Sequence, residues 1–106
     1  MGKYLLQGTY SAEGAKGLLK EGGSSRRAAV EKLVQGLGGK VEAFYYAFGN
    51  DDVYVIVDAP SNADIAAASM AVGASGAVGL KTTVLLTPEE IDEAAKKSVA
   101  YRPPGA

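Results

Sequence analysis

The sequence predicts an α+β fold in which helices cover one face of a four-stranded antiparallel sheet. β-prone and helix-prone segments follow one another in the order β-α-β-β-α-β-α. Only a short turn-forming stretch separates the second and third β-prone segments, as in an antiparallel hairpin. The chain has 106 residues, 47% apolar and 22% charged, which is the size and balance of one globular domain. We therefore expect residues 1–106 to form a single domain.

The first half of the chain combines one strand with an interrupted helical region. The first strand is expected over residues 3–10, KYLLQGTY, and it stops at Ser11, a good helix N-cap. Residues 12–37 are helical, with a break at Gly22-Gly23-Ser24-Ser25. The second helical piece places apolar residues at the i, i+3, i+4, i+7 spacing of one buried face: Ala29, Val30, Leu33, Val34 and Leu37.

Two further strands, over residues 40–48 and 53–58, are joined by a short polar turn. Gly49 and Asn50 tolerate the left-handed conformations of a tight connection, and Asp52 can accept backbone N–H bonds across it. A metal site at the paired aspartates is the alternative, but spacing places no third ligand beside them. We therefore expect Gly49, Asn50 and Asp52 to form a structural turn.

The second half of the chain has clearer helix signals. Ser61 is the expected N-cap of a helix that is rich in small side chains and runs to about Ser75. Residues 78–86 form the fourth strand, and Thr87-Pro88-Glu89-Glu90 has the form of a capping box that starts a last helix. A tail over residues 99–106 follows. Two split β-α-β units of this kind make a ferredoxin-like βαββαβ plait, here with an extra C-terminal helix.

Composition excludes several classes of function. Eleven basic and twelve acidic residues give a net charge of −1, which does not build the positive field of a nucleic-acid-binding protein. The chain has no cysteine and no histidine, so thiolate metal sites, His-ligated metals and His-dependent catalytic triads are impossible. We expect a cytoplasmic protein without metal or cofactor, and with neither nucleic acid nor membrane as partner.

Strand alternation gives the sheet one face without helices. Tyr54, Ile56 and Asp58 of the third strand point to one side, and Lys81 of the fourth is expected there. The second strand leaves two alternatives open, since either of two sets of its residues can face this side: Phe44, Tyr46 and Phe48, or Val41, Ala43, Tyr45 and Ala47.

An apolar sheet face of this kind predicts self-association. Such a patch is large for a monomer, so we expect a homodimer or higher homo-oligomer that pairs through this face. The paired sheets could enclose a pocket for a small anionic or apolar ligand, with Tyr46, Tyr54, Lys81 and Asp58 as candidate pocket residues. RNA binding on exposed aromatic residues is disfavoured because basic residues do not surround them.

A second candidate site lies at the glycine- and serine-rich helix break. Arg26 and Arg27 follow Ser24 and Ser25, and together with free N–H groups they could bind an anion. In the alternative interpretation both arginines are solvated and pair with Glu21 or Glu31.

Three stretches of the chain resemble the GYD-domain family over about residues 3–95. They are YLLQGTY, LGGKVEAFYYAFGNDDVYVIVDAP and ASMAVGASGAVGLKTTVLLTPEE. The family is named for a Gly-x-Tyr-Asp turn, which Gly49 and Asp52 match, whereas Asp51 stands where tyrosine is expected. The family resembles the dimeric α/β-barrel superfamily, which implies ferredoxin-like protomers paired through their sheets.

Two functional hypotheses follow from these observations. The first is a non-catalytic oligomeric module that binds a small molecule or a partner protein. The second is a cofactor-free enzyme that uses Tyr and Lys groups on a small, partly apolar substrate in a pocket at the dimer interface. A pocket of about 300 Å³ or more with convergent polar groups would favour the enzyme.

Overall fold

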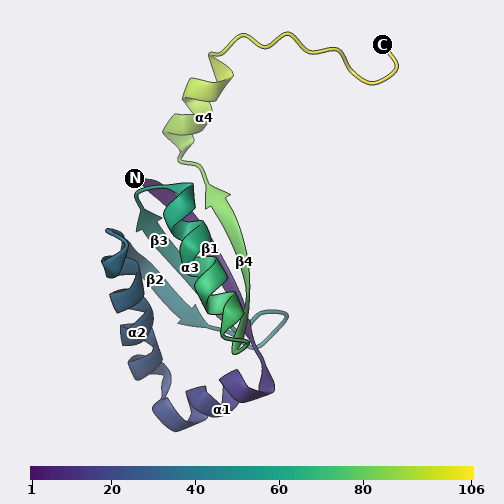
Figure 1. Cartoon of the computed structure of the whole chain (residues 1–106). Coiled ribbons are helices and arrows are strands. Elements are labelled where there is room, and N and C mark those ends of the chain that lie inside the picture. The colour runs from purple at the N-terminus through teal and green to yellow at the C-terminus, as the bar shows by residue number, and fades with distance from the viewer.

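The computed structural model describes all residues, Met1–Ala106. Figure 1 shows one sheet with helices on one of its faces. The elements in chain order are β1 (Gly2–Tyr10), α1 (Ala12–Glu21), α2 (Gly23–Gly36), β2 (Lys40–Tyr46), β3 (Val53–Ala59), α3 (Asn62–Ala74), β4 (Val78–Leu85) and α4 (Pro88–Ala95).

The strands form one four-stranded sheet in the order β2-β3-β1-β4, and every neighbouring pair is antiparallel. This is the topology of two interlocked split β-α-β units, so the predicted α+β ferredoxin-like plait is confirmed. Helices α2 and α3 lie across the same face of the sheet (Figure 1). We call the opposite face, which no helix covers, the open face.

Local capping explains where three of the helices begin. The Ser11 side chain accepts a hydrogen bond from the backbone N–H of Gly14, and the Ser61 side chain accepts one from the backbone N–H of Asp64. Thr87 and Glu90 form the full reciprocal capping box, with Pro88 in the first turn. These predicted helix starts are confirmed, although α4 ends at Ala95, before the predicted start of the tail at residue 99.

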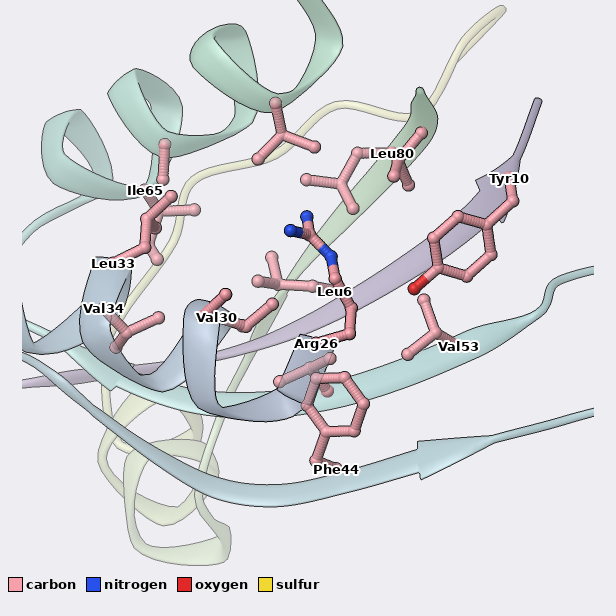
Figure 2. Close-up of a pocket in the computed structure, with 15 residues that line it drawn as sticks. Leu6, Tyr10, Arg26, Val30, Leu33, Val34, Phe44, Val53, Ile65 and Leu80 are labelled. Carbon is pink, nitrogen blue, oxygen red and sulfur yellow. The ribbon is translucent and has the colours of Figure 1, made fainter. Parts of the chain in front are cut away.

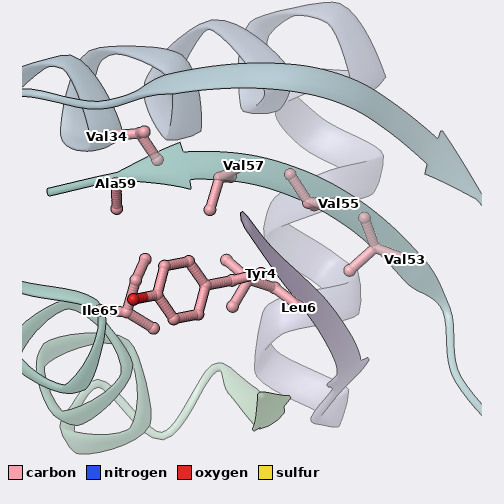
Figure 3. Packing of buried hydrophobic residues seen from close by; sticks show 8 residues of the cluster. All are labelled: Tyr4, Leu6, Val34, Val53, Val55, Val57, Ala59 and Ile65. Atoms are coloured by element: carbon pink, nitrogen blue, oxygen red, sulfur yellow. The ribbon is translucent and has the colours of Figure 1, made fainter. Parts of the chain in front are cut away.

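The core lies between the helices and the centre of the sheet. Val57 and Val34 are almost completely buried, on β3 and α2 respectively. Figure 3 shows side chains of β1 and β3 meeting those of α2 and α3 in one cluster. Its members are Tyr4, Leu6, Val34, Val53, Val55, Val57, Ala59 and Ile65.

A bulge decides which way β2 faces. The register with β3 shifts between Val41 and Ala43, so one residue is inserted between two paired positions. Val41 therefore shares the helix side with the later Phe44 and Tyr46, whereas Ala43 and Tyr45 pair with open-face residues of β3. Neither of the two alternation sets left open by the sequence describes the whole strand, because strict alternation does not continue through a bulge.

The β2–β3 connection is longer than predicted and spans Ala47–Asp52. A hydrogen bond of 2.9 Å from the Ala47 backbone N–H to the Asp52 carbonyl oxygen closes the connection. The prediction of left-handed conformations at Gly49 and Asn50 is wrong. Positive φ angles occur only at four other glycines: Gly22, Gly38, Gly76 and Gly105. A loop of this length reverses direction without them.

Helix α4 and the tail leave the body of the molecule at the end of β4 and project from it (Figure 1). Every residue from Pro88 to Ala106 is exposed. Because its start is capped locally, α4 needs no tertiary contact to define where it begins. No helix in the structure combines the length and the apolar character that crossing a membrane requires.

Candidate functional site

The open face carries a buried carboxylate at one end. Asp51 is only 3% exposed, although it belongs to the polar turn. Its carboxylate accepts hydrogen bonds from the Thr9 hydroxyl at 2.9 Å and the Gln7 amide at 3.1 Å, both on β1. The Lys81 ammonium group on β4 lies 3.3 Å from the same carboxylate. Asp51 thus joins the hairpin turn to two strands of the sheet.

The surroundings of Asp51 favour its ionised form. The Thr9 hydrogen bond, followed by the nearby Lys81 ammonium group, holds the pKa of Asp51 below its ordinary value. Lys81 is 68% exposed at its side chain and already faces an anion. It is therefore not the free cation that the predicted ligand pocket requires.

A second charged cluster lies at the other end of the open face. The Lys3 ammonium group on β1 contacts Asp58 at 3.0 Å and also donates to Glu42. These two hydrogen bonds, first that to Glu42 and then that to Asp58, raise the pKa of Lys3. The partner of Asp58 is thus Lys3. Between the two clusters, the open face presents the half-buried side chains of Leu5, Tyr54 and Ile56.

Tyr46 does not join the other candidate pocket residues. Its register partner is Val53, on the helix side of the sheet, and its hydroxyl donates to the Gly23 carbonyl oxygen at 3.0 Å. Its ring packs edge-on against Phe44, with ring centroids 5.3 Å apart. Burial, followed by the neighbouring Tyr10, raises the pKa of Tyr46. Of the four predicted pocket residues, only Tyr54, Lys81 and Asp58 share the open face, and no hydrogen bond or ion pair joins them.

The structure has an apolar cavity of about 100 Å³ on the helix side, between α2, α3 and the sheet (Figure 2). Fourteen of its fifteen lining residues are hydrophobic. Helix α3 explains the space, because only Ile65, Ala68 and Val72 of that helix reach the cavity, and half of their neighbours along the helix are alanine. Small side chains on one wall leave a gap that the Val30 and Leu33 side chains of α2 do not fill.

Arg26 is the fifteenth lining residue of this cavity. It is partly buried and lies four residues before Val30, so it occupies the sheet-facing side of α2. Figure 2 shows its guanidinium group among the apolar lining side chains. No carboxylate lies within ion-pair distance of Arg26, whereas Arg27 pairs with Glu31 at 3.8 Å. The two arginines of the predicted anion site therefore have different environments.

The remaining turn residue, Asp52, acts through the backbone. Its carboxylate accepts a hydrogen bond from the Tyr10 backbone N–H at 2.8 Å. Its own backbone N–H donates a hydrogen bond to the Gly8 carbonyl oxygen, also at 2.8 Å. The two carboxylates of Asp51 and Asp52 thus have separate partners, and no group of three carboxylates that could hold a metal ion occurs in the chain.

These features define an α+β protein with one open sheet face and an apolar cavity under its helices. A model of the GYD domain family matches residues 4–95, so the chain belongs to the GYD domain family. No curated protein and no solved structure matches the chain with significant similarity.

Two contributions to these sites were not predicted from the sequence. Asp51 belongs to the predicted polar turn, and nothing in the local sequence indicates that the turn folds back onto β1 and β4. The sequence does indicate the position of Arg26 on the sheet-facing side of α2, because the apolar spacing of that helix, extended back by one turn from Val30, reaches Arg26.

Proposed function

We propose that the protein is a non-catalytic binding module that works as a homodimer paired through its open sheet face. The observation that carries the proposal is the uncovered centre of this face, where Leu5, Tyr54 and Ile56 lie on neighbouring strands with no helix above them. Apolar side chains in such a contiguous group favour removal from water by a partner.

The charges on the open face support the same proposal. Burying an unpaired charge in an interface is costly, whereas a charge that is already paired can be covered at a lower cost. Both lysines of β1 and β4 on this face are paired, Lys3 with Asp58 and Glu42, and Lys81 with Asp51. The same face on a second copy has the matching apolar centre, as a two-fold symmetric interface requires.

The polar groups of the face favour binding over catalysis. A general base needs a free lone pair within reach of a substrate. Here the Asp51 carboxylate accepts from three side chains, and Asp58 is held by Lys3. Both groups stabilise the fold in the conformation described.

The test is to place a charge in the proposed interface. Tyr54→Glu should convert a dimer to a monomer, because two carboxylates would be buried without partners when the faces meet. Tyr101→Glu is the matched control, since Tyr101 lies in the exposed tail and the same change there should leave the dimer intact. Light scattering on both variants distinguishes the outcomes, and a Tyr54→Glu protein that remains folded and dimeric would contradict the proposal.

A further inference from the structure

Arg26 borders the apolar cavity and has no ion-pair partner, although Glu13 and Glu21 line a neighbouring pocket with it. The other cavity-lining residues are hydrophobic, and the lining includes no acidic residue. Helix periodicity holds Arg26 in the sheet-facing row with Val30 and Leu33, so its side chain starts on the inner side of the helix. A guanidinium group bordered by apolar side chains is stabilised when an anion hydrogen-bonds to it.

We propose that this cavity binds a small monocarboxylate with a compact apolar body, the carboxylate bound by Arg26 and the body held between α2 and α3. This site is separate from the open face and goes beyond the proposed homodimeric module. A carboxylate fits because its two oxygens match the planar fork of the guanidinium group.

The size of the cavity limits the apolar body. Its volume of about 100 Å³ is somewhat smaller than the ~150 Å³ apolar cavity that accepts benzene. Leu33, which lines the cavity, is 39% exposed, so the cavity is not fully enclosed. The apolar body is therefore limited to a short branched chain, or to one ring that is not fully enclosed, and a long fatty acid or a nucleotide does not fit.

Tyr10 supplies a second polar group. It lies at the end of β1 and lines the same cavity, and Figure 2 shows its hydroxyl turned toward the interior. A phenol hydroxyl can donate to a carboxylate without bringing a charge that competes with it. The cavity thus combines an apolar wall with one cation and one neutral donor, which is the pattern of a small-molecule site with a defined ligand orientation.

The test is calorimetric titration of the full chain with benzoate. Benzamide is the neutral ligand of the same shape, and acetate has the charge without the apolar body. We expect benzoate to bind and both controls to bind at least about tenfold more weakly, the benzamide loss being that of a charged hydrogen-bond partner.

Three variants assign the binding to this cavity. Arg26→Met keeps an unbranched apolar stem but removes the guanidinium group, and should weaken benzoate binding about tenfold or more. Arg27→Met is its matched control, because it removes the neighbouring exposed arginine and should leave binding unchanged. Ala68→Leu fills the cavity from α3, and should raise the melting temperature while abolishing binding.

The outcomes are decisive in both directions. Binding that Arg26→Met and Ala68→Leu abolish, and that Arg27→Met retains, supports the site. If Ala68→Leu stabilises the protein but benzoate does not bind the wild type at millimolar concentration, the cavity is only a packing gap and the proposal is wrong. Binding that survives Arg26→Met or Ala68→Leu would place the ligand elsewhere and also overturn it. None of these results depends on whether the open faces pair.

Discussion

Adjacent aspartates in the hairpin turn attach it to β1 in two different ways. The Asp52 carboxylate accepts the Tyr10 backbone N–H, and the Asp51 carboxylate accepts side-chain donors from Gln7 and Thr9. The first bond satisfies a main-chain N–H group that lies beyond the end of the β1–β3 ladder, whose last pair is Gly8 and Val53. The second brings a charge to the sheet surface, where Lys81 compensates it.

Removing the Asp52 carboxylate should destabilise the protein. Asp52→Ala leaves the Tyr10 N–H without its acceptor, and we expect the free energy of unfolding to fall by about 0.5–2 kcal/mol in urea denaturation. Asp52→Asn keeps an acceptor oxygen and should lose less. Calcium or magnesium should leave the melting temperature of the wild type unchanged. An upward shift with either ion that Asp52→Ala abolishes would replace the structural role by a metal site.

Asp51 should make stability sensitive to acid. Its folded-state pKa is depressed, so its contribution is complete above the ordinary aspartate pKa of about 4 and disappears as the pH falls through the folded-state value. Asp51→Ala should therefore be less stable than the wild type at pH 7, and the difference should shrink below about pH 4. Urea midpoints measured from pH 7 to pH 2.5 test this, and a difference that stays constant would contradict it.

Prediction at the level of single residues succeeded where the cause is local. The N-cap role of Ser61 and the capping box at Thr87 depend on residues three positions apart, and both are confirmed. Asp52 accepts a hydrogen bond from a backbone N–H, as predicted, but the donor is Tyr10 of β1 and does not lie across the turn. The burial of Asp51 depends on β1 and β4, which are distant in sequence, so local spacing gave no indication of it.

At the scale of elements, the register of β2 was the point that the sequence left open. Both faces of this strand are apolar, and the bulge between Val41 and Ala43 changes the alternation partway along it. The structure places Phe44 and Tyr46 under the helices and leaves Tyr45 on the open face. The cavity was equally unpredicted, because it depends on the distance between α2 and α3 and not on either helix alone.

Helix α4 should contribute nothing to the stability of the body of one chain. Its residues are exposed throughout, and its first turn is stabilised by its own capping box. We therefore expect a chain that ends at Leu86 to fold with a melting temperature within about 3 °C of the full-length protein at a concentration where both are monomeric. Calorimetry on the two chains tests this. A loss of much more would mean that α4 or the tail packs against the body.

At the scale of the whole molecule, the two faces of the sheet differ in what covers them. Helices α2 and α3 bury the valine row of β3, whereas Tyr54 and Ile56 on its other side have no cover within the chain. The ferredoxin-like plait leaves one face free by construction, since both crossover helices pack on the same side. A second copy of the chain supplies the missing layer in the proposed homodimer.

The measurement that tests this account most directly is the mass of the wild-type protein by sedimentation equilibrium. At roughly tens of micromolar, where a dissociation constant in the low micromolar range or below would keep most chains paired, we predict twice the 10.8 kDa of one chain. A mass of 10.8 kDa at all concentrations up to that range would contradict the account, because the open face would then remain in water on a stable monomer.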